Sequence, residues 1–166
     1  MLKIGNLGTR AATYAILCVI ALIPALVAAQ SKTSNTDMQI LLDKIKADKK
    51  LVVAANLELT EPEKMTFWPI YDAYQKDLQG INERMGKTIR SYADAYNSKS
   101  LTDEQARKLT DDALAIEADE AKLRSTYAAK LNAVLPAKTV ARYIQIEGKI
   151  RAALRYDMAS SIPLVP

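Results

Sequence analysis

The 166-residue sequence has no histidine, one cysteine at position 18 and only five glycines. Without histidine there is no Ser-His-Asp or Cys-His relay, no imidazole metal ligand and no histidine switch near neutral pH. The glycines are scattered, and none of them has the spacing of a phosphate-binding loop. These absences exclude the histidine-dependent hydrolases, the histidine-ligated metal sites and the nucleotide-binding fingerprints.

The first 29 residues have the order of a secretory signal peptide. A positively charged start is followed by an apolar run over residues 11–23, a helix-breaking Pro24 and an alanine-rich end. This order predicts cleavage before Gln30 and export to the periplasm. An uncleaved membrane anchor is the alternative, since residues 11–29 approach the roughly 20 residues that a transmembrane helix needs. Pro24 and the small residues that follow favour cleavage.

Cleavage changes the charge of the chain. Removing 29 of the 166 residues leaves 137, with 21 basic and 19 acidic side chains and a net charge of +2. A nearly balanced chain offers no basic face for nucleic acid, so we expect no nucleic-acid partner. The mature chain also has neither cysteine nor histidine, and we expect no disulfide, no metal and no cofactor. Membrane contact is expected only through the signal segment before it is cleaved.

The rest of the sequence has the periodicity of helices. Apolar residues recur every three or four positions over residues 36–159, and no segment alternates with a period of two. We therefore expect a single all-helical domain over residues 36–159. A polar lead-in over residues 30–35, predicted to be disordered, precedes it, and a C-terminal tail over residues 160–166 follows it.

Two capping boxes mark the helix starts. Thr60 is followed by Glu63, and Thr102 is followed by Gln105, each at the spacing in which both side chains bond the other residue's backbone N–H. With a first helix over residues 37–55, these starts predict a second helix of 37 residues, a loop over residues 97–100 and a third helix of 33 residues. Pro136 ends the third helix or opens a fourth that fades near residue 159. Pro69 should kink the second helix near its start.

The lengths of these helices predict the architecture. We expect four helices with a long central antiparallel hairpin, because the second and third would be about 55 and 50 Å long and the others nearer 30 Å. The apolar stripe of the second helix has a mean spacing close to the 3.5 residues of a coiled coil. Two short helices cannot cover two long ones, so part of the stripe stays open or meets a second copy. An elongated homodimer is the simplest arrangement.

Two carboxylates interrupt apolar stripes, Glu120 on the third helix and Glu147 on the fourth. Carboxylates that face the core of a helical bundle are typical of di-iron proteins, but those sites need Glu-x-x-His pairs. We therefore favour a buried glutamate paired with an arginine, for example Arg142 or Arg84, over a metal site.

Aromatic residues are concentrated on the second helix. Six of the nine in the mature chain lie there: Phe67, Trp68, Tyr71, Tyr74, Tyr92 and Tyr96. An aromatic stripe at helical spacing is most often part of a core. The functional interpretation is an adaptable binding surface, since tyrosine and tryptophan offer apolar faces with polar tips and are enriched in binding hot spots.

The capped starts carry a family resemblance. Leu101-Thr102-Asp103-Glu104-Gln105 has the pattern Leu-Thr-x-x-Gln, and Leu59-Thr60-Glu61-Pro62-Glu63 has it with Glu in the last place. In a small, exported, helical protein, these segments resemble the LTxxQ family of periplasmic stress proteins, also called Spy/CpxP-like. The order of helices over residues 36–159 is similar too. That family's second motif opens the last long helix, whereas the literal motif here opens the third.

The resemblance implies a non-enzymatic, ATP-independent periplasmic chaperone that binds unfolded envelope proteins. Its expected binding surface is the concave side of the second helix with lysines of the first: Trp68, Tyr71, Tyr74, Met85, Lys46 and Lys50. The alternative is a stress-response regulatory adaptor that docks on one specific envelope partner. No nucleophile–base pair is visible, so we do not expect an enzyme.

Overall fold

The computed structural model divides the chain into two units, residues 1–49 and residues 50–166. It describes residues 40, 42–45 and 47–166, so the expected signal peptide, the lead-in and Lys46 lie outside the described residues. In the first unit, residues 40, 42–45 and 47–49 are helical. Of the single domain expected over residues 36–159, the part from Lys50 onward forms one compact unit that also includes the tail.

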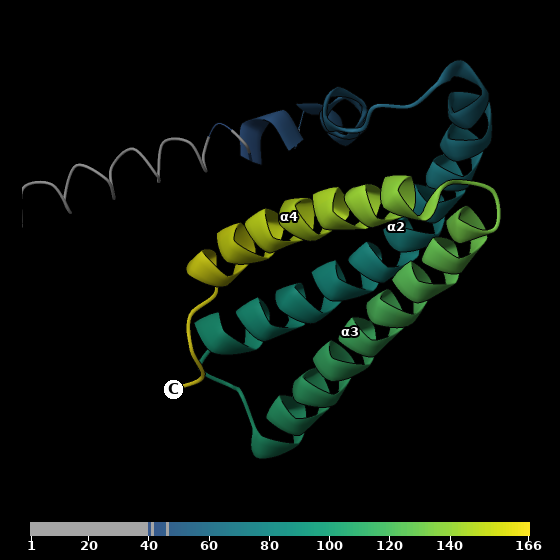
Figure 1. Cartoon of the computed structure of the whole chain (residues 1–166). Helices are drawn as coiled ribbons and strands as arrows, with labels where there is room; N and C mark the ends of the chain where they lie inside the picture. Colours follow the sequence, from purple (N-terminus) through teal and green to yellow (C-terminus); the bar gives the residue numbers. More distant parts are fainter. Residues whose placement is uncertain (1–39, 41, 46) are drawn as a thin grey trace, which may run out of the picture. The chain divides into compact units, whose positions relative to one another are not determined.

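The second unit is built from helices. A helical segment that ends at residue 56 precedes α2 (Glu61–Asn97), α3 (Asp103–Asn132) and α4 (Ala137–Ser161) (Figure 1). No residue among 40, 42–45 and 47–166 is in a strand, so the expected all-helical class is confirmed for the described chain. α2 begins where the Thr60 cap predicts, and it includes Asn97, which was expected to lie in the loop. Pro136 is the N-cap of α4, and the short connection after Asn132 separates it from α3.

The predicted caps are present at both helix starts. The backbone N–H and the hydroxyl of Thr60 donate to one carboxylate oxygen of Glu63, at 2.8 and 2.9 Å. At α3 the Gln105 N–H donates to the Thr102 hydroxyl oxygen at 3.2 Å, and the Thr102 N–H donates to Gln105 Oε1 at 3.0 Å. These bonds satisfy first-turn groups that have no partner inside a helix, which is why each helix begins where it does.

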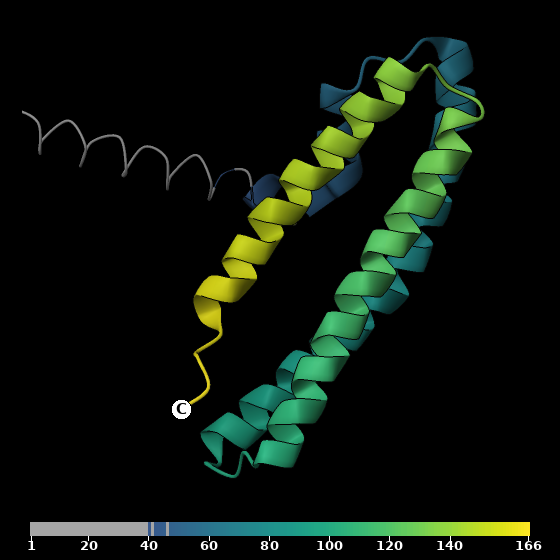
Figure 2. The same ribbon diagram turned by 60° about the horizontal axis from the view of Figure 1, so that its bottom comes forward.

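α2 passes through Pro69 as one helix, and its first turns run in a different direction from the remainder (Figures 1 and 2). A change of direction is the usual consequence of a proline inside a helix, because the ring removes one hydrogen bond and crowds the preceding turn. The turn that joins α2 to α3 contains Lys99, whose φ of 53° is in the left-handed region. The Ser100 N–H closes this turn on the Ala95 carbonyl at 3.0 Å.

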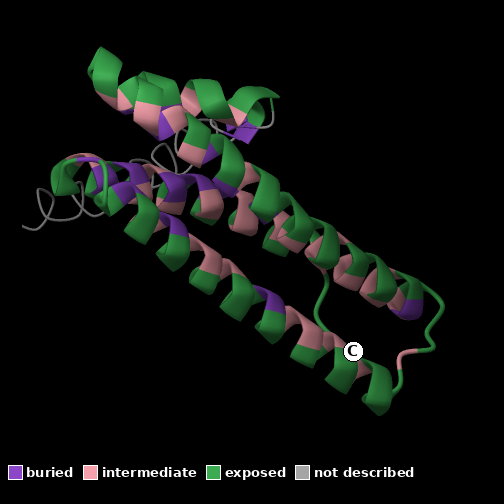
Figure 3. Ribbon diagram, turned by 90° about the vertical axis from the view of Figure 1, so that its right-hand side faces the viewer, coloured by how far each residue is buried: buried purple, intermediate pink, exposed green. Residues whose placement is uncertain are grey.

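α2 and α3 form the predicted antiparallel hairpin, and α4 returns along it in the direction of α2 (Figure 2). The core of the unit is richest where α4 begins (Figure 3). Aromatic rings dominate it: Phe67 meets Tyr143 edge to face at 5.0 Å between ring centroids, and Tyr74 meets Tyr127 at 5.3 Å. Val53 of the segment before α2 is fully buried as well.

Burial decreases toward the α2–α3 turn. Over residues 81–97 of α2, all of them described, Ala95 alone is buried, and over residues 103–126 of α3 only Ile116 is. The apolar positions Ile81, Met85 and Ile89 are half-buried. The lengths of the helices predicted a stripe with incomplete cover, and this half of the hairpin has one. The homodimer stays a prediction.

Candidate binding surface

An apolar face lies on the first turns of α2. Met65, Trp68 and Pro69 are three and four residues apart, so they share one side of the helix. Met65 is 80% exposed, Pro69 is exposed and Trp68 is half-buried. Exposed apolar residues that share one side of a helix mark an interaction site more often than a scattered single residue does.

Lys50 borders this face. Its ammonium lies 5.1 Å from the centroid of the Trp68 ring and donates to both carboxylate oxygens of Asp72, at 2.7 and 3.0 Å. Both charged side chains are about half exposed, so their pairing contributes little to stability by itself. The pair gives the apolar face a charged rim on one side.

The Trp68 ring packs against two neighbouring aromatic rings of α2. It makes edge contacts with Phe67 at 4.9 Å and with Tyr71 at 5.3 Å between ring centroids. Phe67 is fully buried, so the ring rests on the core while part of it stays accessible. An aromatic side chain held in this way loses little conformational freedom on binding, which is a property of interface hot spots.

The structure brings together only part of the predicted surface. Trp68 and Lys50 are neighbours, as expected, whereas Tyr71 and Tyr74 are only 2% and 5% exposed and belong to the core. Their rings are covered by α4 and α3 through contacts with Tyr143 and Tyr127. An open surface at these two tyrosines was therefore a wrong expectation. Periodicity places residues on one stripe but does not say which of them another helix will cover.

Two other predicted residues are not part of this face. Met85 is half-buried and lies 17 residues beyond Trp68, about 25 Å along the helix. Lys46 lies outside the described residues. Met65 and Pro69 were missed, although their spacing from Trp68 is the signal that would have found them.

The interior carboxylate of α4 has other partners than those expected. Glu147 is 5% exposed, and its Oε1 accepts from the Tyr143 hydroxyl at 3.3 Å and from Gln75 Nε2 at 3.4 Å. Arg142, proposed as a partner, instead donates to the Asn56 carbonyl at 2.8 Å. The prediction that Glu147 is buried is confirmed. The prediction of Arg142 was wrong, because Arg142 points toward the segment that precedes α2.

Burial also raises the pKa values of the tyrosines around Glu147. Desolvation, followed by the nearby Glu147 charge, raises the pKa of Tyr143 and the pKa of Tyr74 well above the ordinary value of 10. The pKa of Tyr127 is raised as well, chiefly by its hydrogen bond to Asp77 at 2.6 Å. All three hydroxyls stay protonated through the physiological range and act as donors or acceptors rather than as bases.

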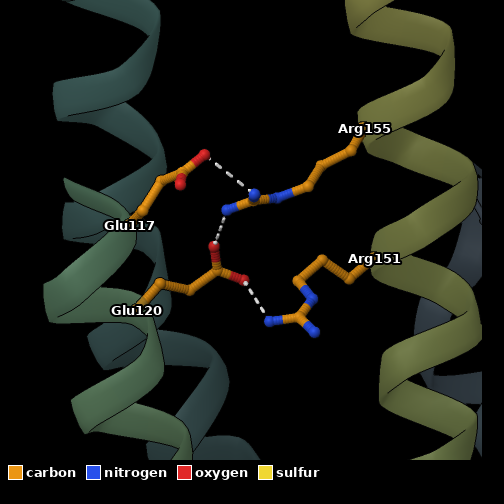
Figure 4. A network of polar contacts seen from close by, with 4 residues as sticks. All are labelled: Glu117, Glu120, Arg151 and Arg155. Carbon is orange, nitrogen blue, oxygen red and sulfur yellow. Dashed lines mark hydrogen bonds and ion pairs between the residues drawn. The ribbon is translucent and has the colours of Figure 1, made fainter. Parts of the chain in front are cut away.

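Glu120 forms the predicted arginine pair with different arginines (Figure 4). Its carboxylate lies 2.7 Å from Arg155 Nη2 and 3.8 Å from Arg151 Nη1, and Arg155 also reaches Glu117 at 2.9 Å. Arg84, the partner proposed from the sequence, pairs with Asp119 at 2.6 Å instead. Helix spacing indicates which residues face the neighbouring helix, but the axial register between α3 and α4 decides which of them meet.

Among residues 40, 42–45 and 47–166, no group of three or more His, Cys, Asp or Glu side chains is close enough to hold a metal ion. Within the same described residues, no helix is both long and apolar enough to span a membrane. Comparisons with protein-family models, with curated proteins and with solved structures found no match to this chain. The resemblance to the LTxxQ family therefore rests on the two helix starts and the order of the helices.

Proposed function

We propose that this protein is a non-enzymatic, ATP-independent chaperone of the periplasm that binds exposed apolar segments of unfolded envelope proteins. The observation that supports it is the apolar face of Met65, Trp68 and Pro69 with Lys50 at its edge. Keeping such a face in water costs about 25 cal/mol for each Å² of apolar area, a cost that a bound apolar segment removes. The signal-like N-terminus and the two LTxxQ-like starts support the proposed compartment and family.

The chemistry of the face suits many clients rather than one. Met65 is unbranched and flexible, so its thioether adapts to apolar groups of different shape. Trp68 offers a broad ring that is held in place by its neighbours. The Lys50 ammonium adds attraction for client carboxylates and carbonyls without a fixed geometry. Flexible methionine and aromatic surfaces of this kind are typical of promiscuous binders.

The half-buried part of the hairpin supports a second element of the proposal, a homodimer. Ile81, Met85 and Ile89 follow one another along α2 with incomplete cover. A second copy of the chain would cover such a stripe. Sedimentation equilibrium of the mature protein should then give twice the mass of one chain, and a single-chain mass at micromolar concentration would contradict it.

An aggregation assay tests the chaperone proposal. Mature protein is added at stoichiometric amounts, without nucleotide, to two unrelated denatured clients, and light scattering follows their aggregation. We expect suppression with both clients. Failure to protect either of them would contradict the proposal and favour the regulatory adaptor, which would bind one envelope partner and leave denatured clients to aggregate.

A further inference from the structure

The two halves of α4 are attached to the hairpin in different ways. Its first half is anchored in the core by buried side chains, namely Val140, Tyr143, Glu147, Ile150 and Ala153. Over residues 154–161, each of which the structure describes, none is buried. The second half is therefore the part of α4 that can leave the hairpin at the lowest cost in apolar burial.

Ion pairs hold this second half in place (Figure 4). The Arg155 guanidinium bridges Glu117 and Glu120 of α3 at 2.9 and 2.7 Å, and Arg151 adds a longer contact of 3.8 Å to Glu120. Beyond the helix end, the Tyr92 hydroxyl donates to the Pro163 carbonyl at 3.0 Å. The arginine side chains are more than a third exposed, so each pair is weak and exchangeable with other charges.

The contact between α3 and the end of α4 joins basic side chains on α4 to acidic side chains on α3. On α4, Arg151, Leu154, Arg155 and Met158 are three and four residues apart and share one side of the helix, so this stretch presents two cations beside two apolar side chains. On α3, Glu117 and Glu120 border the stripe that contains Ala113 and Ile116. We call the surface formed by Ala113, Ile116, Glu117 and Glu120 the α4 seat.

We propose that the α4 seat is an interaction site for a basic amphipathic helix of a partner protein, which the second half of α4 occupies in the free molecule. A partner helix that supplies two cations at the same spacing can take over the ion pairs that Arg151 and Arg155 make with Glu117 and Glu120. The displaced half of α4 then returns to water as an exposed helix. This site is separate from the face around Trp68, so it does not rest on the proposed chaperone function.

Because α4 and the added helix compete for the α4 seat, changing the charges on α4 and on α3 should have different effects on binding. Removing the arginines of α4 weakens the intramolecular occupant and leaves the seat intact, so an added helix should bind more tightly. Removing the carboxylates of α3 breaks the same ion pairs but damages the seat itself. The two kinds of variant would behave alike if the ion pairs only stabilised the fold.

The test uses the full mature chain and a labelled synthetic peptide with the sequence of residues 149–163, KIRAALRYDMASSIP. Fluorescence anisotropy at low ionic strength measures its affinity for the wild type, for the double variant R151Q/R155Q and for the double variant E117Q/E120Q. We expect R151Q/R155Q to bind the peptide at least fivefold more tightly than the wild type does. E117Q/E120Q should bind it no more tightly than the wild type. Equal affinities for the two double variants, or no binding to R151Q/R155Q, would overturn the proposal.

Two controls complete the design. Arg84→Gln breaks the Arg84–Asp119 pair between α2 and α3 and should leave the affinity for the peptide unchanged. A peptide with Gln in place of both arginines should lose its preference for R151Q/R155Q. Amide hydrogen exchange should show faster exchange at residues 154–161 in R151Q/R155Q, while the amides in the first turns of α2 stay protected.

If R151Q/R155Q unfolds, Arg155→Lys provides the same test. This substitution keeps the positive charge but loses the hydrogen bonds to both Glu117 and Glu120. No gain in peptide affinity over the wild type would then overturn the proposal.

Discussion

Thr102 and Gln105 bond each other reciprocally at the start of α3. The Gln105 N–H donates to the Thr102 hydroxyl oxygen at 3.2 Å, and the Thr102 N–H donates to Gln105 Oε1 at 3.0 Å. Neither N–H has an acceptor within the helix, so each bond satisfies a group that would otherwise need water. The same relationship between side chains at positions three apart defines the LTxxQ-like segments.

Removing this cap should destabilise the protein. Thr102→Ala is expected to lower the free energy of unfolding by about 1 kcal/mol, the usual contribution of an N-cap hydroxyl. Thr102→Ser keeps the hydroxyl and should leave stability nearly unchanged. Urea unfolding followed by circular dichroism compares the variants, and equal midpoints for the alanine and serine variants would show that the cap contributes nothing.

The cap of α2 should depend on pH. Hydrogen bonds from Thr60, chiefly from its backbone N–H, hold the pKa of the Glu63 carboxyl below its ordinary value of 4.5. Because the folded pKa is the lower one, this stabilisation is complete above the unfolded pKa and is lost as the pH falls through the folded pKa. The stability advantage of the wild type over Glu63→Gln should therefore be larger at pH 7 than at pH 3. Urea midpoints at both pH values measure it, and a pH-independent difference would contradict the assignment.

The Tyr143 hydroxyl should contribute to stability through Glu147. Tyr143→Phe removes a donor to a buried carboxylate and is expected to cost about 1 kcal/mol, since an acceptor in the core then loses one of its partners. Tyr156→Phe makes the same change on an exposed ring of the same helix and should be neutral. Thermal unfolding of the two variants side by side gives the comparison, and equal effects would argue against a role for the buried bond.

Lys99 offers a stabilising substitution. Its φ of 53° is strained for a residue with a Cβ atom, whereas glycine adopts this conformation freely. Lys99→Gly should therefore raise the free energy of unfolding by up to about 1 kcal/mol, after the greater freedom of glycine in the unfolded chain is counted. Lys87→Gly, within α2, should instead destabilise by roughly 1 kcal/mol. The denaturant midpoints of the two variants and the wild type measure these changes. A loss of stability in Lys99→Gly would mean that the turn is not strained.

The helices could be predicted from the sequence because their signals are local. Thr60 and Thr102 fix two starts through side chains only three residues away, and Pro136 separates α3 from α4. The stripe of apolar residues then gives the class of the fold. Each of these signals acts within one or two turns of the chain, so no knowledge of the packing was needed.

The partners across helices could not be predicted in the same way. Glu120 meets Arg155 of α4, and Arg84 of α2 meets Asp119 instead, because the register of α3 against both neighbouring helices depends on the whole packing. Tyr71 and Tyr74 lie on the same stripe as the more exposed residues of α2, and only the placement of Tyr143 and Tyr127 puts them in the core. The accessible face at Met65 was missed for the same reason, since burial is set by neighbours that are distant in sequence.

The measurement that tests the proposed binding face most directly compares two exposed apolar residues in the client aggregation assay. Met65 is 80% exposed on the face beside Trp68, and Leu114 is 61% exposed on α3. Met65→Ser and Leu114→Ser should both leave the thermal midpoint unchanged, because neither side chain is packed in the core. We expect Met65→Ser to lose most of the protection of denatured clients and Leu114→Ser to retain it. Equal protection by the two variants would contradict the assignment of client binding to the first turns of α2.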